Sequence, residues 1–344
     1  MSSTTHVLVS TSDRYNFEWE SETLSRIPDF KFELRPGTPS TPEEMVELAH
    51  DADALLVSSR EPVSRSTIEQ LKRCKVVARY AVGLDHLDLE AAAEHGIVVT
   101  HYPMYCTNEV ADHALSMILA LNRRIVQFDR DLRGGAWVTH THHMDKMLRG
   151  PIPPLREMTV GIIGIGRIGT EVASRLAPFK VRLLATDPYL DDETIRNRGA
   201  EPVSFETLLS ESDIVTIHCP HTPETEHFID ASAFGQMKPT AFLVNTARGP
   251  IVDLNAAIVA LSNGRIAGAA LDVVYPEPLP ADSPLYALQN VILTPHAAYY
   301  SERSVEIIRM ETLMAAVDVL QGRLPKVVAN PGVLSRVNLA PARP

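Results

Sequence analysis

The chain has 344 residues, of which 45% are hydrophobic and 22% charged, a composition typical of a globular protein with a substantial core. At roughly 100–200 residues per domain, this length indicates two domains. The formal net charge of −11 argues against nonspecific binding to nucleic acid or anionic lipid, because both need a basic protein surface. No apolar run reaches the roughly 18 residues of a membrane span, so we expect no membrane partner.

The N-terminus and the cysteines indicate the cellular compartment. The first residues, MSSTTHVLVS, lack the basic start and long apolar stretch of a signal peptide. Cys74, Cys106 and Cys219 are far apart and form no C-x-x-C pair, which is typical of reduced thiols. We therefore expect a cytoplasmic protein.

The first part of the chain alternates short apolar runs with longer amphipathic stretches, a pattern typical of βαβ units in a parallel sheet. Strands are predicted at HVLVS, FKFEL, ALLVSS, KVVARYAVG and IVVTHY. A long helix is predicted from about residue 108 to 133, because its apolar residues recur on one stripe. The polar, proline-rich segment 139–154 is predicted to be a loop or arm.

A second series of apolar runs follows this segment. Six strands are predicted at TVGIIGIG, VRLLATD, DIVTIHCP, AFLVNTARG, AGAALDVV and NVILTPH, with helices between them. This count is close to that of a dinucleotide-binding fold. A long C-terminal helix is predicted from about residue 301 to 320.

The stretch GIIGIGRIG places Gly164, Gly166 and Gly169 in the spacing G-x-G-x-x-G. The motif follows a predicted strand and opens a predicted helix, which is the context that dinucleotide binding requires. Backbone N–H groups at such a helix start can hold a pyrophosphate. Asp187 ends the next strand, where a carboxylate can bind the ribose hydroxyls and repel a 2′-phosphate. The sequence therefore predicts NAD rather than NADP.

Three later strands are each followed by a residue suited to catalysis. Arg248 follows AFLVN, Glu277 follows AGAALDVV, and His296 follows NVIL. The carboxyl ends of parallel strands form the ligand crevice of open α/β sheets. A guanidinium matches a carboxylate in two-point contact, and a carboxylate beside a histidine stabilises its charged form. We predict an anion clamp and a proton donor.

The segments GIGRIG, NTARG, LDVVYPEP and TPHAA resemble those of the D-isomer-specific 2-hydroxyacid dehydrogenases, the family of phosphoglycerate, glycerate and D-lactate dehydrogenases. The resemblance covers nearly the whole chain. It implies an α/β fold of two doubly wound parallel-sheet domains, Rossmann-like or flavodoxin-like. In this arrangement an NAD-binding domain of residues 105–297 is inserted into a discontinuous substrate domain of residues 1–104 and 298–344.

The resemblance also implies roles for individual residues. Arg248 would orient the substrate carboxylate and carbonyl, His296 would be the acid/base, and Glu277 would pair with it. The backbone of Ala81, Val82 and Gly83 would bind the substrate carboxylate, and Tyr299 would add an aromatic wall. Asp272 would lie near the nicotinamide amide. The expected NAD contacts lie in the glycine turn and at later strand ends: Gly164, Gly166, Arg167, Ile168, Gly169, Asp187, Cys219, Pro220, Thr225, Thr246, Ala247, Arg248, Asp272, His296 and Ala298.

These observations predict an NAD-dependent oxidoreductase that interconverts a small D-2-hydroxy acid and its 2-oxo acid, and that forms a homodimer. Two alternatives stay open. HAAYYSE and EVADHAL look most like the C-terminal-binding-protein branch, whose animal members are transcriptional corepressors, so an NAD(H)-sensing binding protein with weak dehydrogenase activity is one alternative. Phosphite or formate oxidation is the other, and Glu277 counts against it.

A histidine cluster is the one candidate metal site. His140, His142 and His143 form THTHH in a polar segment. No acidic or cysteine partner lies nearby at ligand spacing, so we expect no bound metal.

Overall fold

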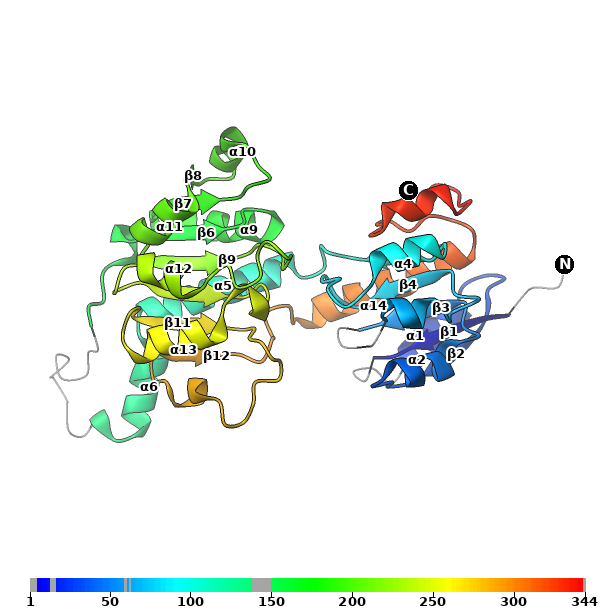
Figure 1. Ribbon diagram of the computed structural model, residues 1–344, viewed down its shortest axis with the longest axis horizontal. Helices are drawn as coiled ribbons and strands as arrows, with labels where there is room; N and C mark the ends of the chain where they lie inside the picture. Colours follow the sequence, from blue (N-terminus) through cyan, green and yellow to red (C-terminus); the bar gives the residue numbers. More distant parts are fainter. Residues whose placement is uncertain (1–4, 13–16, 59–60, 62, 138–149, 343–344) are drawn as a thin grey trace. The chain divides into compact units, whose positions relative to one another are not determined.

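The computed structural model describes residues 5–12, 17–58, 61, 63–137 and 150–342. The THTHH cluster and most of the predicted arm lie outside these described residues. The chain divides into two compact units (Figure 1). One comprises Met1–Tyr105 with Ser301–Pro344, and the other comprises Cys106–Tyr300.

The first unit is built on a five-stranded sheet of order β2-β1-β3-β4-β5, in which every pairing is parallel. This is the flavodoxin-like order, and all five strands were predicted. The strands are β1 (Thr5–Ser10), β2 (Lys31–Pro36), β3 (Ala54–Val57), β4 (Val76–Arg79) and β5 (Val98–His101). The helices are α1 (Glu18–Ser25), α2 (Pro42–Ala49), α3 (Arg65–Ile68), α4 (Leu89–Glu94) and α14 (Glu302–Leu320).

Both faces of this sheet are covered. The strands β3 and β4 are buried along their whole length, which explains the apolar sequence ALLV of β3 and the apolar start VVA of β4. Met45 and Ala49 of α2 pack on one face with Val9, Leu55 and other strand residues. The helix α14 packs against β3, β4 and β5.

Polar contacts join the C-terminal part of this unit to the N-terminal part. Arg309 of α14 forms a two-point ion pair with Glu20 of α1, with N–O distances of 2.8 and 2.7 Å, and Glu20 is fully buried. Asn330 accepts a hydrogen bond from the N–H of Val99 and donates one to the carbonyl of Ile97, at 2.8 and 2.9 Å. Its amide thus satisfies the edge of β5 as a neighbouring strand would.

The second unit has a seven-stranded parallel sheet of order β12-β11-β10-β9-β6-β7-β8. Counted from β6, this is the dinucleotide-binding order with one further strand, β12, at an edge. The strands are β6 (Thr159–Ile163), β7 (Arg182–Thr186), β8 (Glu201–Pro202), β9 (Ile214–Ile217), β10 (Phe242–Asn245), β11 (Gly268–Leu271) and β12 (Val291–Leu293). Only β8 was not predicted. It consists of one glutamate and one proline at the edge of the sheet, and two such residues give no strand pattern.

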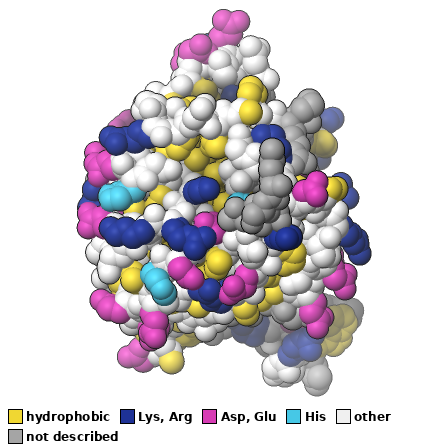
Figure 2. Space-filling model, turned by 90° about the vertical axis from the view of Figure 1, so that its right-hand side faces the viewer, with side chains coloured by type: hydrophobic (Ala, Val, Ile, Leu, Met, Phe, Trp, Pro, Cys, Tyr) yellow, Lys and Arg dark blue, Asp and Glu magenta, His cyan; other side chains and the backbone are white. Residues whose placement is uncertain are grey.

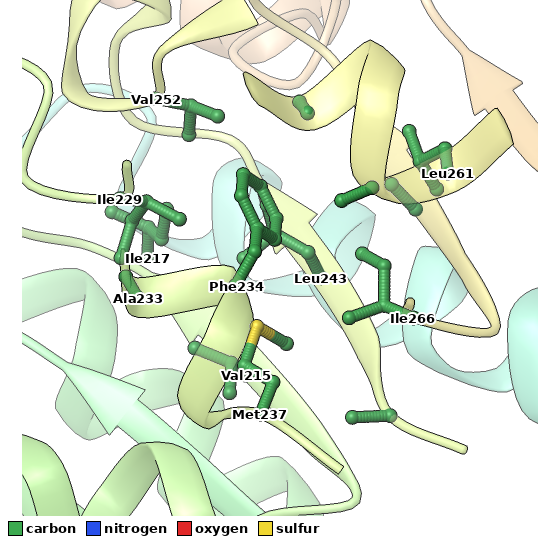
Figure 3. Packing of buried hydrophobic residues seen from close by; sticks show 14 of the residues in the cluster. Val215, Ile217, Ile229, Ala233, Phe234, Met237, Leu243, Val252, Leu261 and Ile266 are labelled. Carbon is green, nitrogen blue, oxygen red and sulfur yellow. The ribbon is translucent and has the colours of Figure 1, made fainter. Parts of the chain in front are cut away.

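Alternate side chains of these strands enter two cores on opposite faces. Ile162 and Val244 pack with helices α5 (Thr107–Asn122) and α9 (Arg167–Leu176). Ile163 and Leu243 pack on the other face with α11 (Phe205–Glu211), α12 (Ala231–Gln236) and α13 (Leu254–Ser262). Figure 3 shows the ring of Phe234 within this second core. The short helix α10 (Asp192–Asn197) follows β7.

The prediction of a single helix over residues 108–133 is wrong, because the chain forms two helices there, α5 and α6 (Ile125–Arg133). Arg124 between them has a left-handed backbone with φ +56°. The buried face of α5 ends at Leu121 and Asn122, so the residues beyond have no core to extend along. The guanidinium of Arg124 turns instead over the ring of Phe242, 4.8 Å from its centroid.

On the face of the molecule seen in Figure 2, basic and acidic side chains are interspersed. In the described part of the chain, no helix combines the length and the apolar character needed to cross a membrane. Nor does any group of three or more His, Cys, Asp or Glu within the described ranges have a geometry that could hold a metal ion.

Candidate active site

The turn between β6 and α9 carries the three glycines of the predicted motif. Gly164 has φ +83°, and a Cβ there would come within 2.7 Å of the backbone nitrogen of Cys219. A Cβ at Gly169 would collide with the carbonyl oxygen of Gly164, so α9 approaches the turn closely only because this position is glycine. A Cβ at Gly166 would meet no atom within 4 Å. This opening lies at the start of α9, beside Arg167 and Ile168, and fits the pyrophosphate of NAD.

Asp187 directly follows β7 and is fixed against the glycine turn. Its Oδ2 accepts a hydrogen bond from the N–H of Ile165, and its Oδ1 accepts one from the N–H of Tyr189, both at 3.1 Å. Each carboxylate oxygen can accept a second hydrogen bond. The side chain therefore retains the capacity to bind two ribose hydroxyls.

The loop after β9 borders the glycine turn. Cys219 packs against Gly164, and burial raises the pKa of its thiol to about 11, so the thiol is protonated at neutral pH. The hydroxyl of Thr225 lies 2.9 Å from the carbonyl oxygen of Pro220 and accepts a hydrogen bond from the N–H of Thr222 at 2.8 Å. Thr225 thus closes the loop upon itself, and any contact of its side chain with the cofactor would be secondary to this structural role.

The turn after β10 presents Arg248. The buried side chain of Asn245 shapes this turn, because it accepts a hydrogen bond from the N–H of Ala247 and donates one to the carbonyl of Arg248, at 3.0 and 2.9 Å. A Cβ at Gly249 would collide with the backbone of Val274, which explains the Gly-Pro pair. The guanidinium of Arg248 is half-buried, and its Nη1 donates to the carbonyl of Ala247 at 2.7 Å.

Thr246 lies in the same turn. Thr246 is only 7% exposed, and its hydroxyl oxygen is buried without a hydrogen-bond partner among the described residues. Because buried hydroxyls are rarely left without a partner, this oxygen is suited to accept a hydrogen bond from a bound ligand or to donate one to it.

His296 and Glu277 form a pair. The Nδ1 atom of His296 lies 3.0 and 3.2 Å from the two carboxylate oxygens of Glu277. An ionised carboxylate only accepts hydrogen bonds, so Nδ1 carries a proton, and Nε2 is the ring nitrogen that Glu277 does not contact. The ring of Tyr299 lies edge-on to that of His296, with centroids 6.3 Å apart.

Asp272, which follows β11, is buried beneath the turn that carries His296. Its Oδ1 accepts the N–H of Ala297 at 2.8 Å, and its Oδ2 accepts the N–H of Ala298 at 3.0 Å. Its backbone carbonyl accepts the N–H of His296 at 2.8 Å. The carboxylate expected near the nicotinamide amide therefore has about half of its hydrogen-bonding capacity occupied by N–H groups of this turn.

Two residues near Asp272 were not among the predicted site residues. Thr294 Oγ1 donates to Asp272 Oδ1 at 2.5 Å, and His113 Nε2 of α5 lies 3.0 Å from the same Thr294 oxygen. Thr294 stands two residues before His296 in the TPHAA motif, so its place in the motif could have indicated it. No sequence signal joins His113 to that motif.

The segment Ala81–Val82–Gly83 belongs to the other unit and follows β4. The carbonyl of Val82 accepts a hydrogen bond from Nδ1 of His101, at 2.7 Å. The N–H groups of these three residues donate no hydrogen bond to other described residues, and all three are partly exposed. Successive N–H groups of this kind can bind an anion.

Within Cys106–Tyr300, the structure thus brings the predicted catalytic residues to one edge of the sheet. Arg248 follows β10, Glu277 follows β11, and His296 follows β12, and these three strands are neighbours. The glycine turn and Asp187 follow β6 and β7 at the same carboxyl ends. The arrangement combines an opening for a dinucleotide with a cation and an acid/base pair.

Comparison with known proteins agrees with this geometry. Residues 115–298 match the family described as D-isomer specific 2-hydroxyacid dehydrogenase, NAD binding domain. The glyoxylate reductase of Thermofilum pendens is 41% identical over 300 residues, which is 86% of each chain. The D-lactate dehydrogenase of Aquifex aeolicus, solved with NAD and lactic acid, superimposes with a TM-score of 0.79 at 28% identity, covering 96% of this chain and 98% of that one.

A second solved structure has the same fold but contains NADP, the other nicotinamide cofactor. The NADPH-dependent glyoxylate/hydroxypyruvate reductase of Sinorhizobium meliloti, solved with NADP and malonate, has a TM-score of 0.80 and 28% identity, covering 94% of this chain and 97% of that one. The predicted fold class and the predicted NAD cofactor are confirmed. The chain belongs to the D-isomer specific 2-hydroxyacid dehydrogenase family.

Proposed function

We propose that this protein is an NAD-dependent oxidoreductase that reduces a small 2-oxo acid to the D-2-hydroxy acid and catalyses the reverse reaction. The observation that carries the proposal is the pairing of His296 Nδ1 with the carboxylate of Glu277, at 3.0 Å, at the same sheet edge as the glycine turn that fits a dinucleotide. Because relatives such as that of Thermofilum pendens are glyoxylate reductases, glyoxylate is the first substrate to test.

The cofactor is held by the glycine turn and Asp187. The N–H groups at the start of α9 bind the pyrophosphate, and Asp187 binds the ribose hydroxyls and disfavours a 2′-phosphate, so NAD is preferred over NADP. The hydroxyl of Thr246 gains a hydrogen-bond partner from bound ligand. Bound NADH supplies the hydride that reaches the carbonyl carbon.

His296 supplies the proton. With Nδ1 held by Glu277, Nε2 donates a proton to the carbonyl oxygen during reduction and takes it back during oxidation. Glu277 fixes the orientation of the ring through its contact with Nδ1. The pair therefore couples proton transfer to hydride transfer at one carbonyl group.

Arg248 binds the substrate carboxylate and stabilises negative charge on the carbonyl oxygen. The N–H groups of Ala81, Val82 and Gly83 bind the same class of anion. This proposal is supported by the fact that these N–H groups donate no hydrogen bond to other described residues. Tyr299, edge-on to His296, limits the size of the substrate side chain.

The protein is also proposed to be a homodimer. The helix α6 has no buried residue, although Ile125, Phe128 and Leu132 recur on one side of it. Ile125 is 55% exposed, and Trp137 beyond the helix is 64% exposed. An apolar stripe of this kind is suited to burial against a second subunit. Sedimentation equilibrium that showed only monomer at micromolar concentration would refute the dimer.

The corepressor-like alternative gains no support from the relatives, which are reductases and dehydrogenases. The discriminating experiment is a screen of 2-oxo acids with NADH and with NADPH, in which turnover is measured as the loss of absorbance of the reduced cofactor. We expect turnover of at least one small 2-oxo acid, with higher kcat/KM for NADH. An enzyme without turnover of any 2-oxo acid would contradict the proposal, and preference for NADPH would contradict the role given to Asp187.

A further inference from the structure

We propose that Thr294 and His113 are positioning residues for His296 and act through the buried carboxylate of Asp272. This inference rests on the proposed role of His296 as proton donor. It extends the site to the helix α5, which neither the sequence motifs nor the strand-end geometry had included.

The backbone of His296 needs support. Its φ is +52°, in the left-handed region that residues with a side chain rarely adopt. Such a conformation persists at functional sites only where surrounding bonds maintain it. Here the N–H groups of three successive residues, His296, Ala297 and Ala298, all donate to Asp272, the first to its backbone carbonyl and the others to its carboxylate.

Asp272 is in turn oriented by Thr294 and His113. The Thr294 hydroxyl has one hydrogen, and it donates this hydrogen to Asp272 Oδ1 at 2.5 Å, since an ionised carboxylate can only accept. The same hydroxyl oxygen must therefore accept from His113 Nε2 at 3.0 Å, which assigns a proton to that nitrogen. His113 Nε2 also lies 3.7 Å from Asp272 Oδ1. The carboxylate side chain is 1% exposed, so water cannot replace these bonds without rearrangement.

His113 joins this turn to the framework of the unit. It lies on α5, whose neighbouring residues Ala111 and Ala114 are buried in the core shared with α9. Asp112 of the same helix also binds Arg175 of α9, at 2.5 Å. The hydrogen bonds thus run from the cofactor-binding helix through α5 to the turn that carries the proton donor.

A merely structural role for Thr294 would lower stability without affecting the step at His296. The test is therefore the pair Thr294→Val and Thr294→Ser. Valine keeps the shape and removes the hydroxyl, whereas serine keeps the hydroxyl. Misplacement by about 1 Å can cost on the order of 10²-fold in rate, so we expect Thr294→Val to lower kcat by about 10–100-fold with NADH affinity nearly unchanged, and Thr294→Ser to recover most of kcat.

An activity-independent readout accompanies the kinetics. In NMR spectra of histidine-labelled protein, the His296 ring signal is assigned by its absence in His296→Asn. It should move in Thr294→Val and return in Thr294→Ser. If Thr294→Val does not fold, the pair His113→Leu and His113→Gln is judged in the same way, because only glutamine keeps an N–H donor.

The outcomes separate the two proposals. A Thr294→Val protein with wild-type kcat and an unmoved His296 signal would overturn the positioning role. So would equal loss in Thr294→Val and Thr294→Ser, because the hydroxyl would then not be the cause. A wild type without turnover of any 2-oxo acid would refute the proposed function alone, and the NMR signal would still decide the positioning role.

Discussion

The unit of Met1–Tyr105 with Ser301–Pro344 joins distant parts of the chain through buried polar contacts, whereas Cys106–Tyr300 folds from one continuous segment around two apolar cores. In the first unit, polar contacts such as Glu20 with Arg309 hold α1 to α14. In the second, polar groups such as Arg248 and His296 directly follow or stand close after the strands β10 and β12. A buried ion pair thus holds two helices together in the first unit, whereas the charged residues proposed for chemistry in the second unit are only partly buried.

The largest expected effect is a loss of turnover on substitution of His296, which should leave stability almost unchanged. Replacing it with Asn removes the proton donor, so kcat should fall by about 10²–10⁴-fold while the free energy of unfolding changes little. Affinity for an unreactive acid such as oxalate should largely persist. Steady-state kinetics, oxalate binding and urea unfolding of the same preparation measure all three, and a variant with unchanged kcat would remove His296 from the mechanism.

The next effect is at Arg248. Loss of one preorganised donor typically costs about 10²–10³-fold in rate, so Arg248→Ala should lose that much in kcat/KM with NADH binding nearly unchanged. Arg248→Lys keeps the charge but loses the planar two-point contact, and should also be badly impaired. Near-wild-type kcat/KM in Arg248→Ala would show that the guanidinium is an ordinary surface group.

In the first unit, substitution of a charged residue should lower the free energy of unfolding instead of the turnover. Arg309→Leu leaves the fully buried carboxylate of Glu20 without its cation, which should cost about 3–5 kcal/mol in the free energy of unfolding. The double variant Glu20→Leu with Arg309→Leu should recover much of this loss. If Arg309→Leu is as stable as the wild type, as judged by urea unfolding, the ion pair does not hold α1 to α14.

The smallest expected effect concerns His218, which directly follows β9. Burial lowers the pKa of His218 from 6.5 to about 3, while the unfolded chain binds its proton at the ordinary value. The unfolded state therefore gains a proton first as pH falls, so His218 costs stability progressively between those two pKa values. His218→Gln should lose less stability than the wild type when pH is lowered from about 7 to about 5. An identical pH dependence of the urea midpoint in both proteins would contradict this assignment.

In both units the sequence predicted the buried strands, and in the second unit it missed features that depend on local surroundings. Strands β3, β4 and β10 are buried along their length and consist mostly of apolar residues, and this produced a clear pattern. Residues that follow such strands share the sheet edge, so Arg248 and His296 could be proposed together. The two-residue strand β8 and the break at Arg124 depend on local surroundings that leave no periodicity.

Contacts between residues far apart in sequence could not be predicted in either unit. Asn330 binds β5 across more than two hundred positions, and His113 reaches Thr294 across 181. A polar side chain carries no indication of which distant partner it will meet. The sequence therefore indicated which residues could react, and the structure was needed to find what holds them in place.

The central claim is that hydride passes to the carbonyl carbon of a small 2-oxo acid with formation of the D-2-hydroxy acid. The most direct test uses NADH carrying deuterium at its transferable position, with the best 2-oxo acid that is larger than glyoxylate. Mass spectrometry should show one deuterium in the product, and chiral analysis should show the D configuration. A product without deuterium, or one of L configuration, would contradict the account.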